Sequence, residues 1–204
     1  MSDYWIYRTK VLTWRNQYVQ ARLMSPAPRA LAERYKPYGF RSALQDEPYG
    51  AALQIVYQVD RRHPHPDNYF ENTSFTLFSD RLVELMRSYN VLAEVFPIGI
   101  VDRRGQPLPE LRYSVFHSLE GLQDAIDPTA SGWTGDRDVG IRSIVLKEAG
   151  FERRPIFRCE HVYLPLMRDD LKQEIQRRRI SGFVFLPLER YQSGTYGPVP
   201  EFED

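Results

Sequence analysis

The stretch "HPHPD" holds the residues best suited to metal chemistry, namely His63, His65 and Asp67. Alternate residues of an extended chain point the same way, so two imidazoles and a carboxylate at this spacing can act as metal ligands. Asn68 follows, where a metal-dependent hydrolase of this pattern normally has another histidine, and no glycine-rich turn comes after it. The two intervening prolines alone predict an extended loop. We therefore expect no bound metal, and a site made of these three residues is the alternative.

The single cysteine, Cys159, lies two residues before His161. On one face of a strand a thiol and an imidazole can act as nucleophile and general base, because the histidine can take the thiol proton. Neither a glycine-rich turn nor a helix start accompanies the pair to stabilise an oxyanion. We therefore expect Cys159 to be a buried core residue. One cysteine also excludes an internal disulfide and every zinc site built from several cysteines.

A later loop, "GWTGDRDVG", combines glycine with aromatic, acidic and basic side chains. It has neither the lysine and hydroxyl residue of a P-loop nor a G-x-G-x-x-G spacing, so no nucleotide site is predicted. An aromatic anchor beside charges of both signs is typical of the energetic centre of a protein interface. The interface candidates in this loop are Trp133, Asp136, Arg137 and Asp138. A plain solvated loop is the alternative.

The elements that must position these loops include a strand, helix and strand over residues 75–102. Ser79 has the side chain of a helix N-cap, and Leu82 and Leu85 fall on one face of the helix that follows. Asn90 is predicted to end that helix. A strand over residues 94–102 and a polar turn then lead into a hairpin partner.

The same order of elements recurs over residues 163–189. Leu171 and Ile175 are predicted to face the core from a helix that begins with two aspartates and finishes with the arginines at 177–179. These charges complement the helix dipole, so they need no phosphate ligand to explain them. Gly182 and the serine before it are expected to end the helix.

The overall pattern predicts a mixed α/β (α+β) fold, with a largely antiparallel sheet or sheets and a few helices packed on them. The length of 204 residues fits a single domain over 1–204, or two closely packed halves of about 1–125 and 126–204. Residues 141–150 and 154–166 are predicted to be further strands, and residues 28–35 a short helix.

Charge and composition narrow the classes of partner. Lysine plus arginine equals aspartate plus glutamate, at 27 each, which gives no indication of nucleic-acid binding. No apolar stretch approaches the roughly 20 residues that span a bilayer, and the start "MSDYWIYRTK" lacks the pattern of a signal peptide. We expect a cytoplasmic protein with no cofactor, no nucleic-acid partner and no membrane partner.

The order of these landmarks resembles a family of immunity proteins from bacterial polymorphic-toxin systems, named from a myxobacterial prototype. Asp67, Tyr69 and Phe70 precede an S-x-x-L-x-x-L helix in "FTLFSDRLVELMRSYNV". The strand "IRSIVLKEAG" and the closing "IFRCEHVYLPLMRDDLKQEIQRRRISGFVFLPLE" also match the family pattern. The likeness covers about residues 59–188.

The resemblance implies a cytoplasmic, non-catalytic antidote that binds and neutralises a toxin effector encoded nearby, in competition between bacteria. Family binding sites do not transfer, because each member is matched to its own toxin. The partner-binding candidates therefore come from this chain alone: Asp67, Tyr69, Trp133, Asp136, Arg137 and Asp138. The alternatives are a structural or adaptor module of a secretion or phage-related assembly, and a metal-dependent hydrolase using His63, His65 and Asp67.

Overall fold

A computed structural model describes residues 3–10, 12–14, 17–24, 55–69, 76–133, 143–159 and 165–191. The chain forms two compact units. The terminal unit comprises Met1–Arg8, Glu120–Arg179 and Phe183–Asp204, and the central unit comprises Thr9–Leu119 and Ile180–Gly182. The organisation as one domain or two packed halves stays a prediction. The helix predicted at 28–35 lies outside the described residues.

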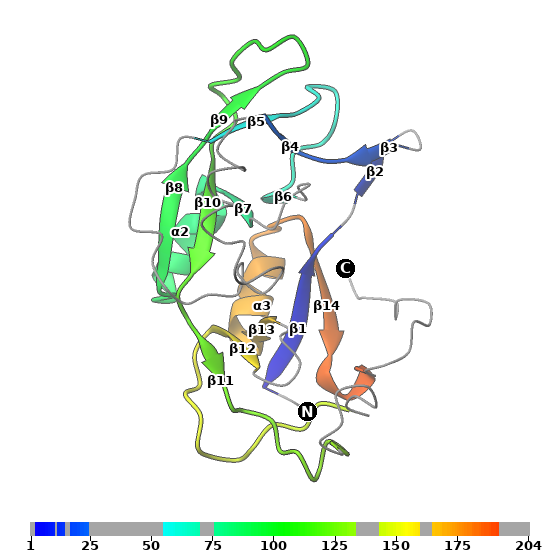
Figure 1. Cartoon of the computed structure of the whole chain (residues 1–204), viewed down its shortest axis with the longest axis vertical. Helices are drawn as coiled ribbons and strands as arrows, with labels where there is room; N and C mark the ends of the chain where they lie inside the picture. Colours follow the sequence, from blue (N-terminus) through cyan, green and yellow to red (C-terminus); the bar gives the residue numbers. More distant parts are fainter. Residues whose placement is uncertain are drawn as a thin grey trace, which may run out of the picture. The chain divides into compact units, whose positions relative to one another are not determined.

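The terminal unit is built on a five-stranded sheet with the order β11-β12-β13-β1-β14 (Figure 1). Its strands are β1 (Tyr4–Thr9), β11 (Leu122–Gln123), β12 (Ile156–Cys159), β13 (Pro165–Arg168) and β14 (Phe183–Pro187). Helix α3 (Asp169–Arg177) connects β13 to β14, yet β1 lies between them and pairs antiparallel with β13. The predicted strand-helix-strand unit is thus a split β-α-β unit completed by the N-terminal strand.

The central unit repeats this topology in a four-stranded sheet with the order β6-β7-β10-β8 (Figure 1). Its strands are β6 (Asn68–Tyr69), β7 (Leu77–Ser79), β8 (Ala93–Pro97) and β10 (Tyr113–Ser118). Helix α2 (Asp80–Ser88) connects β7 to β8, and β10 pairs antiparallel with both. The two stretches that look alike in sequence therefore fold alike, although the inserted strand comes from a different part of the chain.

The strand predicted near residues 94–102 is divided between two sheets. After β8, β9 (Gly99–Val101) pairs in parallel with β5 (Val56–Gln58), in a three-stranded sheet with the order β4-β5-β9. A Cβ on Gly99 would lie 3.3 Å from Val56 Cγ2, so glycine allows the close approach of these strands. The remaining strands are β2 (Leu12–Trp14), β3 (Gln17–Val19) and β4 (Arg22–Leu23).

Helix α2 begins and ends as the sequence predicts. Ser79 is its N-cap, and its Oγ accepts a hydrogen bond from Leu82 N at 3.4 Å. Leu82, Leu85 and Met86 are fully buried on the face that packs against β7 and β10. Just past the end, Asn90 has φ of 56°, a left-handed conformation that asparagine tolerates better than most residues.

Helix α3 ends differently from the prediction. Its N-cap is Arg168, which makes no side-chain capping bond, and Asp169 and Asp170 supply the negative charge of the first turn. At the other end Arg179, with φ of 53°, takes the left-handed position after the helix. The prediction that Gly182 and the serine before it end the helix is therefore wrong. Gly182 instead lies against the backbone of β6 in the central unit.

Each unit has its own hydrophobic core, formed mainly by strand residues. The terminal core contains Tyr4, Ile6, Ala125, Ile126, Ile144, Phe157, Cys159, Leu166, Leu186 and Leu188. The central core contains Ala21, Ile55, Tyr57, Val59, Tyr69, Leu77, Ile100, Leu108, Tyr113 and Val115. The predicted mixed α+β fold with largely antiparallel sheets is confirmed.

The strand predicted at 141–150 is wrong over its described part, residues 143–150. Leu146 makes only an isolated bridge to Ile126, and Gly150 turns the chain with φ of 92°. Ile144 is still buried, so the apolar residues of this segment serve the core without forming a strand. In the described part of the chain, no helix has the length and apolar character needed to cross a membrane.

Candidate interaction surface

His63, His65 and Asp67 interact with different partners within the central unit. His63 Nε2 lies 3.7 Å from Asp60 Oδ2, and His65 Nδ1 lies 3.3 Å from Tyr69 Oη. Both oxygens of Asp67 are directed to other segments, as described below. Among the described residues, no group of three or more histidine, cysteine, aspartate or glutamate side chains is placed to hold a metal ion.

Asp67 connects three segments of the central unit. Its Oδ1 accepts a hydrogen bond from Ser79 Oγ at 2.7 Å and lies 3.3 Å from Arg81 Nε. Its Oδ2 accepts from Ser181 N at 2.9 Å and from Ser181 Oγ at 3.0 Å. The residue is only 8% exposed, so this carboxylate is engaged inside the fold. Partner binding by Asp67 stays a prediction.

Tyr69 belongs to the central core and is 3% exposed. Its ring meets that of Tyr113 edge-on, with centroids 5.6 Å apart, and Tyr113 Oη donates a hydrogen bond to Pro66 O at 2.8 Å. Burial raises the pKa of both phenols, so both stay protonated at physiological pH. The structure places Tyr69 in packing, and its contact with a partner stays a prediction.

Asp60 organises the loop that contains the two histidines. No motif in the sequence identifies this residue as important. It accepts hydrogen bonds from Arg62 N and Nε, both at 3.0 Å, and from Arg62 Nη2 at 2.7 Å. Arg103 Nε, on a different turn, lies 3.2 Å from Asp60 Oδ2. The hydrogen bonds from Arg62 hold the pKa of Asp60 well below its usual range. The pairing of Asp60 with Arg62 could be predicted from their closeness in the sequence, whereas its pairing with Arg103 depends on the fold.

Cys159 is fully buried in the terminal core, as predicted. Burial raises the pKa of its thiol to about 12. The thiolate is the reactive form of cysteine, so a thiol with this pKa is a poor nucleophile at neutral pH. His161, the base of the alternative interpretation, lies outside the described residues.

We expect Cys159 to resist alkylation in the folded protein. At pH 8 a thiol with a pKa of about 12 is ionised to a fraction of about 10⁻⁴, against roughly a quarter for an ordinary cysteine. Iodoacetamide should modify the native protein at least about 100-fold more slowly than the guanidinium-unfolded protein. Intact-mass measurements over time provide the rates, and glutathione in each buffer controls for the reagent. Equal rates in both states would contradict the buried placement.

Trp133 is half-buried against the terminal core. Its backbone N donates to Pro128 O at 2.8 Å, and Asp127 Oδ1 accepts from Ala130 N at 2.8 Å, so hydrogen bonds shape the loop before it. Asp136, Arg137 and Asp138 lie outside the described residues. The tryptophan thus has an anchored ring with part of its surface open, and its role at an interface stays a prediction.

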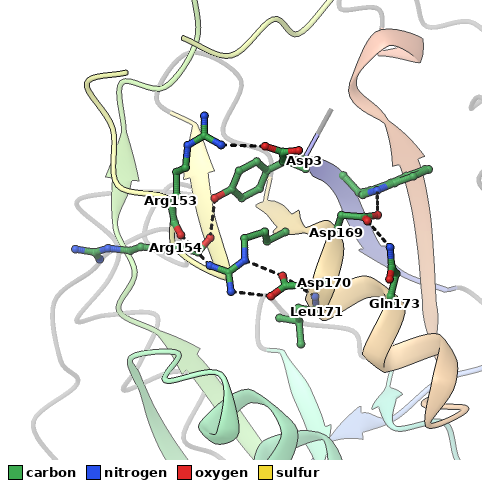
Figure 2. Close-up of polar contacts among 10 residues, drawn as sticks. Asp3, Arg153, Arg154, Asp169, Asp170, Leu171 and Gln173 are labelled. Atoms are coloured by element: carbon green, nitrogen blue, oxygen red, sulfur yellow. Dashed lines mark hydrogen bonds and ion pairs between the residues drawn. The ribbon is translucent and has the colours of Figure 1, made fainter. Parts of the chain in front are cut away.

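The terminal unit carries a cluster of paired charges where α3 begins, shown in Figure 2. Arg153 Nη1 donates to Asp3 Oδ2 at 2.9 Å. Arg168 Nε and Nη2 donate to the two oxygens of Asp170 at 2.7 and 2.8 Å, and its Nη1 donates to Arg153 O at 3.0 Å. A two-point fork of this kind fixes the plane of a guanidinium group. We call these four residues, Asp3, Arg153, Arg168 and Asp170, the arginine surface.

Two aromatic residues, Phe151 and Trp5, lie close to the arginine surface or to the aspartate beside it. The Arg153 guanidinium lies 5.9 Å from the centroid of the Phe151 ring. Trp5 Nε1 donates to Asp169 Oδ1 at 2.8 Å, and Gln173 Nε2 donates to the other oxygen of Asp169 (Figure 2). The side chain of Arg153 is nevertheless 56% exposed. An exposed arginine and a half-buried one, both already oriented and next to half-buried rings, have the composition of protein interfaces.

The arginine surface cannot be predicted from the sequence, for a specific reason. The helix dipole alone explains the aspartates at 169–170, and no local motif contains the arginines at 153–154. Asp3 and Arg153 are 150 positions apart in the chain, and the pairing of β13 with both β1 and β12 brings them together. No local pattern carries that information.

Comparisons of the sequence with protein-family models and with curated proteins found no match. The resemblance to the immunity family therefore rests on the order of landmarks in the sequence.

Proposed function

We propose that this chain is a non-catalytic immunity protein that binds and neutralises a cognate toxin effector in the bacterial cytoplasm. The order of landmarks over about residues 59–188 supports this function. Two of those landmarks, the S-x-x-L-x-x-L helix and the closing strand-helix-strand stretch, form the split β-α-β units described above. Such units provide a rigid scaffold, and inhibition then depends on surfaces that match the toxin.

The arginine surface is the observation that carries the proposal. Binding a protein normally costs side-chain entropy, because long flexible side chains must become ordered at the interface. Here Asp3 orients Arg153 and Asp170 orients Arg168 before any partner arrives. Two oriented guanidinium groups can then meet carboxylates or carbonyls of the toxin and exclude water from its active site.

The positions of the candidate catalytic side chains also support a binding role. Asp67 links β6 to the N-cap of α2, His63 lies beside Asp60, and Cys159 packs in the terminal core. Each of these groups has a structural partner that accounts for its presence. Neutralisation by complementarity needs none of them as a catalyst.

Co-expression with the product of the adjacent gene tests the proposed function. We expect a complex that survives size-exclusion chromatography, together with protection of cells from killing by that product. Failure to obtain either the complex or the protection would overturn the proposal. Stable binding to a secretion or phage-related component, with no toxic neighbour, would instead support the adaptor alternative.

We expect Arg153→Ala to weaken toxin binding by about 2 kcal/mol, or roughly 30-fold in Kd. Its ion pair with Asp3 is exposed on both sides, so the free energy of unfolding should change by less than about 1 kcal/mol. Arg177→Ala is the matched control, because Arg177 is an exposed, ion-paired arginine at the other end of α3. Isothermal titration calorimetry measures both affinities. Equal affinities for the two variants would place the interface elsewhere.

A further inference from the structure

The central unit has a surface pocket of about 240 Å³ between α2 and the strands β8 and β10. Ligand sites for drug-sized molecules usually span roughly 300–1,000 Å³, so this volume suits a single side chain better than a small-molecule substrate. Its apolar lining comes from Val83 on α2 and from Val95 and Pro97 on β8. A methylene chain can pack against these three residues.

Two carboxylates line the same pocket. Asp80 and Glu84 are four positions apart on α2, so they lie on the same side of the helix one turn apart. Both are exposed, and neither side chain has a hydrogen bond or ion pair to another described residue. By contrast, the buried Asp60 and Asp67 of this unit both face arginines. The pocket therefore presents acidic groups that the fold does not neutralise.

Ser114 provides a second, independent indication of a ligand. It lines the pocket from β10 and is only 4% exposed, yet its hydroxyl makes no hydrogen bond to the described residues. Gln123 Nε2 is the one buried side-chain nitrogen or oxygen atom without a hydrogen-bond partner among the described residues, so the Ser114 hydroxyl is reached by solvent from the pocket and is open to a polar group that enters it. The hydroxyl can accept a hydrogen bond from a donor placed between the two carboxylates.

Arg87 lines the pocket one turn beyond Glu84 and sets its overall charge. With two carboxylates and one guanidinium group, the pocket has one net negative charge, which one added cation balances. A guanidinium group carries five N–H donors in a planar fork, which suits two carboxylates and a hydroxyl better than the compact ammonium group of lysine does.

We propose that this pocket takes an arginine side chain from a protein partner. The guanidinium group donates to Asp80, Glu84 and Ser114 Oγ, and the methylene stem packs on Val83 and Pro97. This inference rests on the proposed function, in which the partner is the toxin. The surface of the toxin must then carry a protruding arginine. The arginine surface of the terminal unit is a separate contact region.

A titration of the full chain with N-acetyl-arginine-N-methylamide tests the pocket without a partner. We expect amide shifts at Ser114 and Glu84 in ¹H–¹⁵N spectra at millimolar probe, and no such shifts with the uncharged citrulline analogue. Glu84→Gln should weaken probe binding at least about 5-fold, whereas Glu148→Gln, an exposed change in the terminal unit, should not. Absence of shifts in the pocket, or equal shifts with citrulline, would overturn the proposal.

Binding to the adjacent gene product separates this inference from the proposed function. We expect Glu84→Gln to weaken the complex at least about 10-fold, with Glu148→Gln unchanged. A complex that tolerates Glu84→Gln would remove the pocket from the interface and leave the immunity function intact. If no complex forms at all, the immunity function fails, and the probe titration still decides whether the pocket binds a guanidinium group.

Discussion

Gly182→Ala is expected to lower the free energy of unfolding of the central unit by about 3 kcal/mol or more, from two additive causes. Gly182 has φ of 91°, where a residue with a Cβ is strained by roughly 1–2 kcal/mol. An added Cβ would also lie 2.2 Å from Asn68 O and 3.0 Å from Asn68 C and N. These are backbone atoms of β6, so relief requires separating the strand from the 181–182 segment. That movement breaks the 3.0 Å hydrogen bond from Asn68 N to Ser181 O.

Two glycine controls separate conformational strain from the steric clash. Gly105, in the same unit, has φ of 76°, and Gly150 has φ of 92°, with no atom within 4 Å of an added Cβ at either position. Alanine there should cost only about 1–2 kcal/mol. Urea denaturation followed by circular dichroism gives the three values. A loss at Gly182 no larger than that at Gly105 would contradict the close approach to Asn68.

Local chemistry explains which parts of the fold could be predicted. Ser79 and Asn90 mark the ends of α2 because capping depends on residues next to one another in the chain. Leu171 and Ile175 are buried as expected, since one helix face follows from a spacing of four residues. Strand-helix-strand order could therefore be read directly from the sequence.

The unpredicted features depend on contacts between distant segments. Nothing near residue 165 indicates that Tyr4–Thr9 would lie between β13 and β14, because strand pairing is set by the whole sheet. Gly182 looks like a helix C-cap from its position in the sequence, yet Arg179 takes that conformation and the glycine makes room for Asn68. The arginine surface and the environment of Asp67 could not be predicted either, because both depend on contacts between segments that are distant in the sequence.

Asp67→Asn is expected to destabilise the central unit by about 1–3 kcal/mol, which is the usual cost of leaving a buried hydrogen-bonding group unsatisfied. The amide replaces one acceptor oxygen with an NH₂ group. Ser79 Oγ donates to one carboxylate oxygen and Ser181 N to the other. The NH₂ group must therefore either face Ser181 N, which is another donor, or take the place of the oxygen that accepts from the Ser79 hydroxyl. The N-cap of α2 and the 181–182 segment should both loosen. Hydrogen exchange at Leu82 N and Ser181 N reports on the two contacts separately.

Glu148→Gln is the control for Asp67→Asn, because Glu148 is exposed, has no side-chain partner among the described residues and lies outside the proposed pocket, so its change should stay within about 0.5 kcal/mol. The comparison also separates the two roles open to Asp67. If Asp67 is structural, the folded fraction of the variant should retain its affinity for the adjacent gene product while its unfolding midpoint in urea falls. Weaker binding at unchanged stability would instead make Asp67 a contact residue, and would require its carboxylate to leave Ser79 and Ser181 when the partner binds.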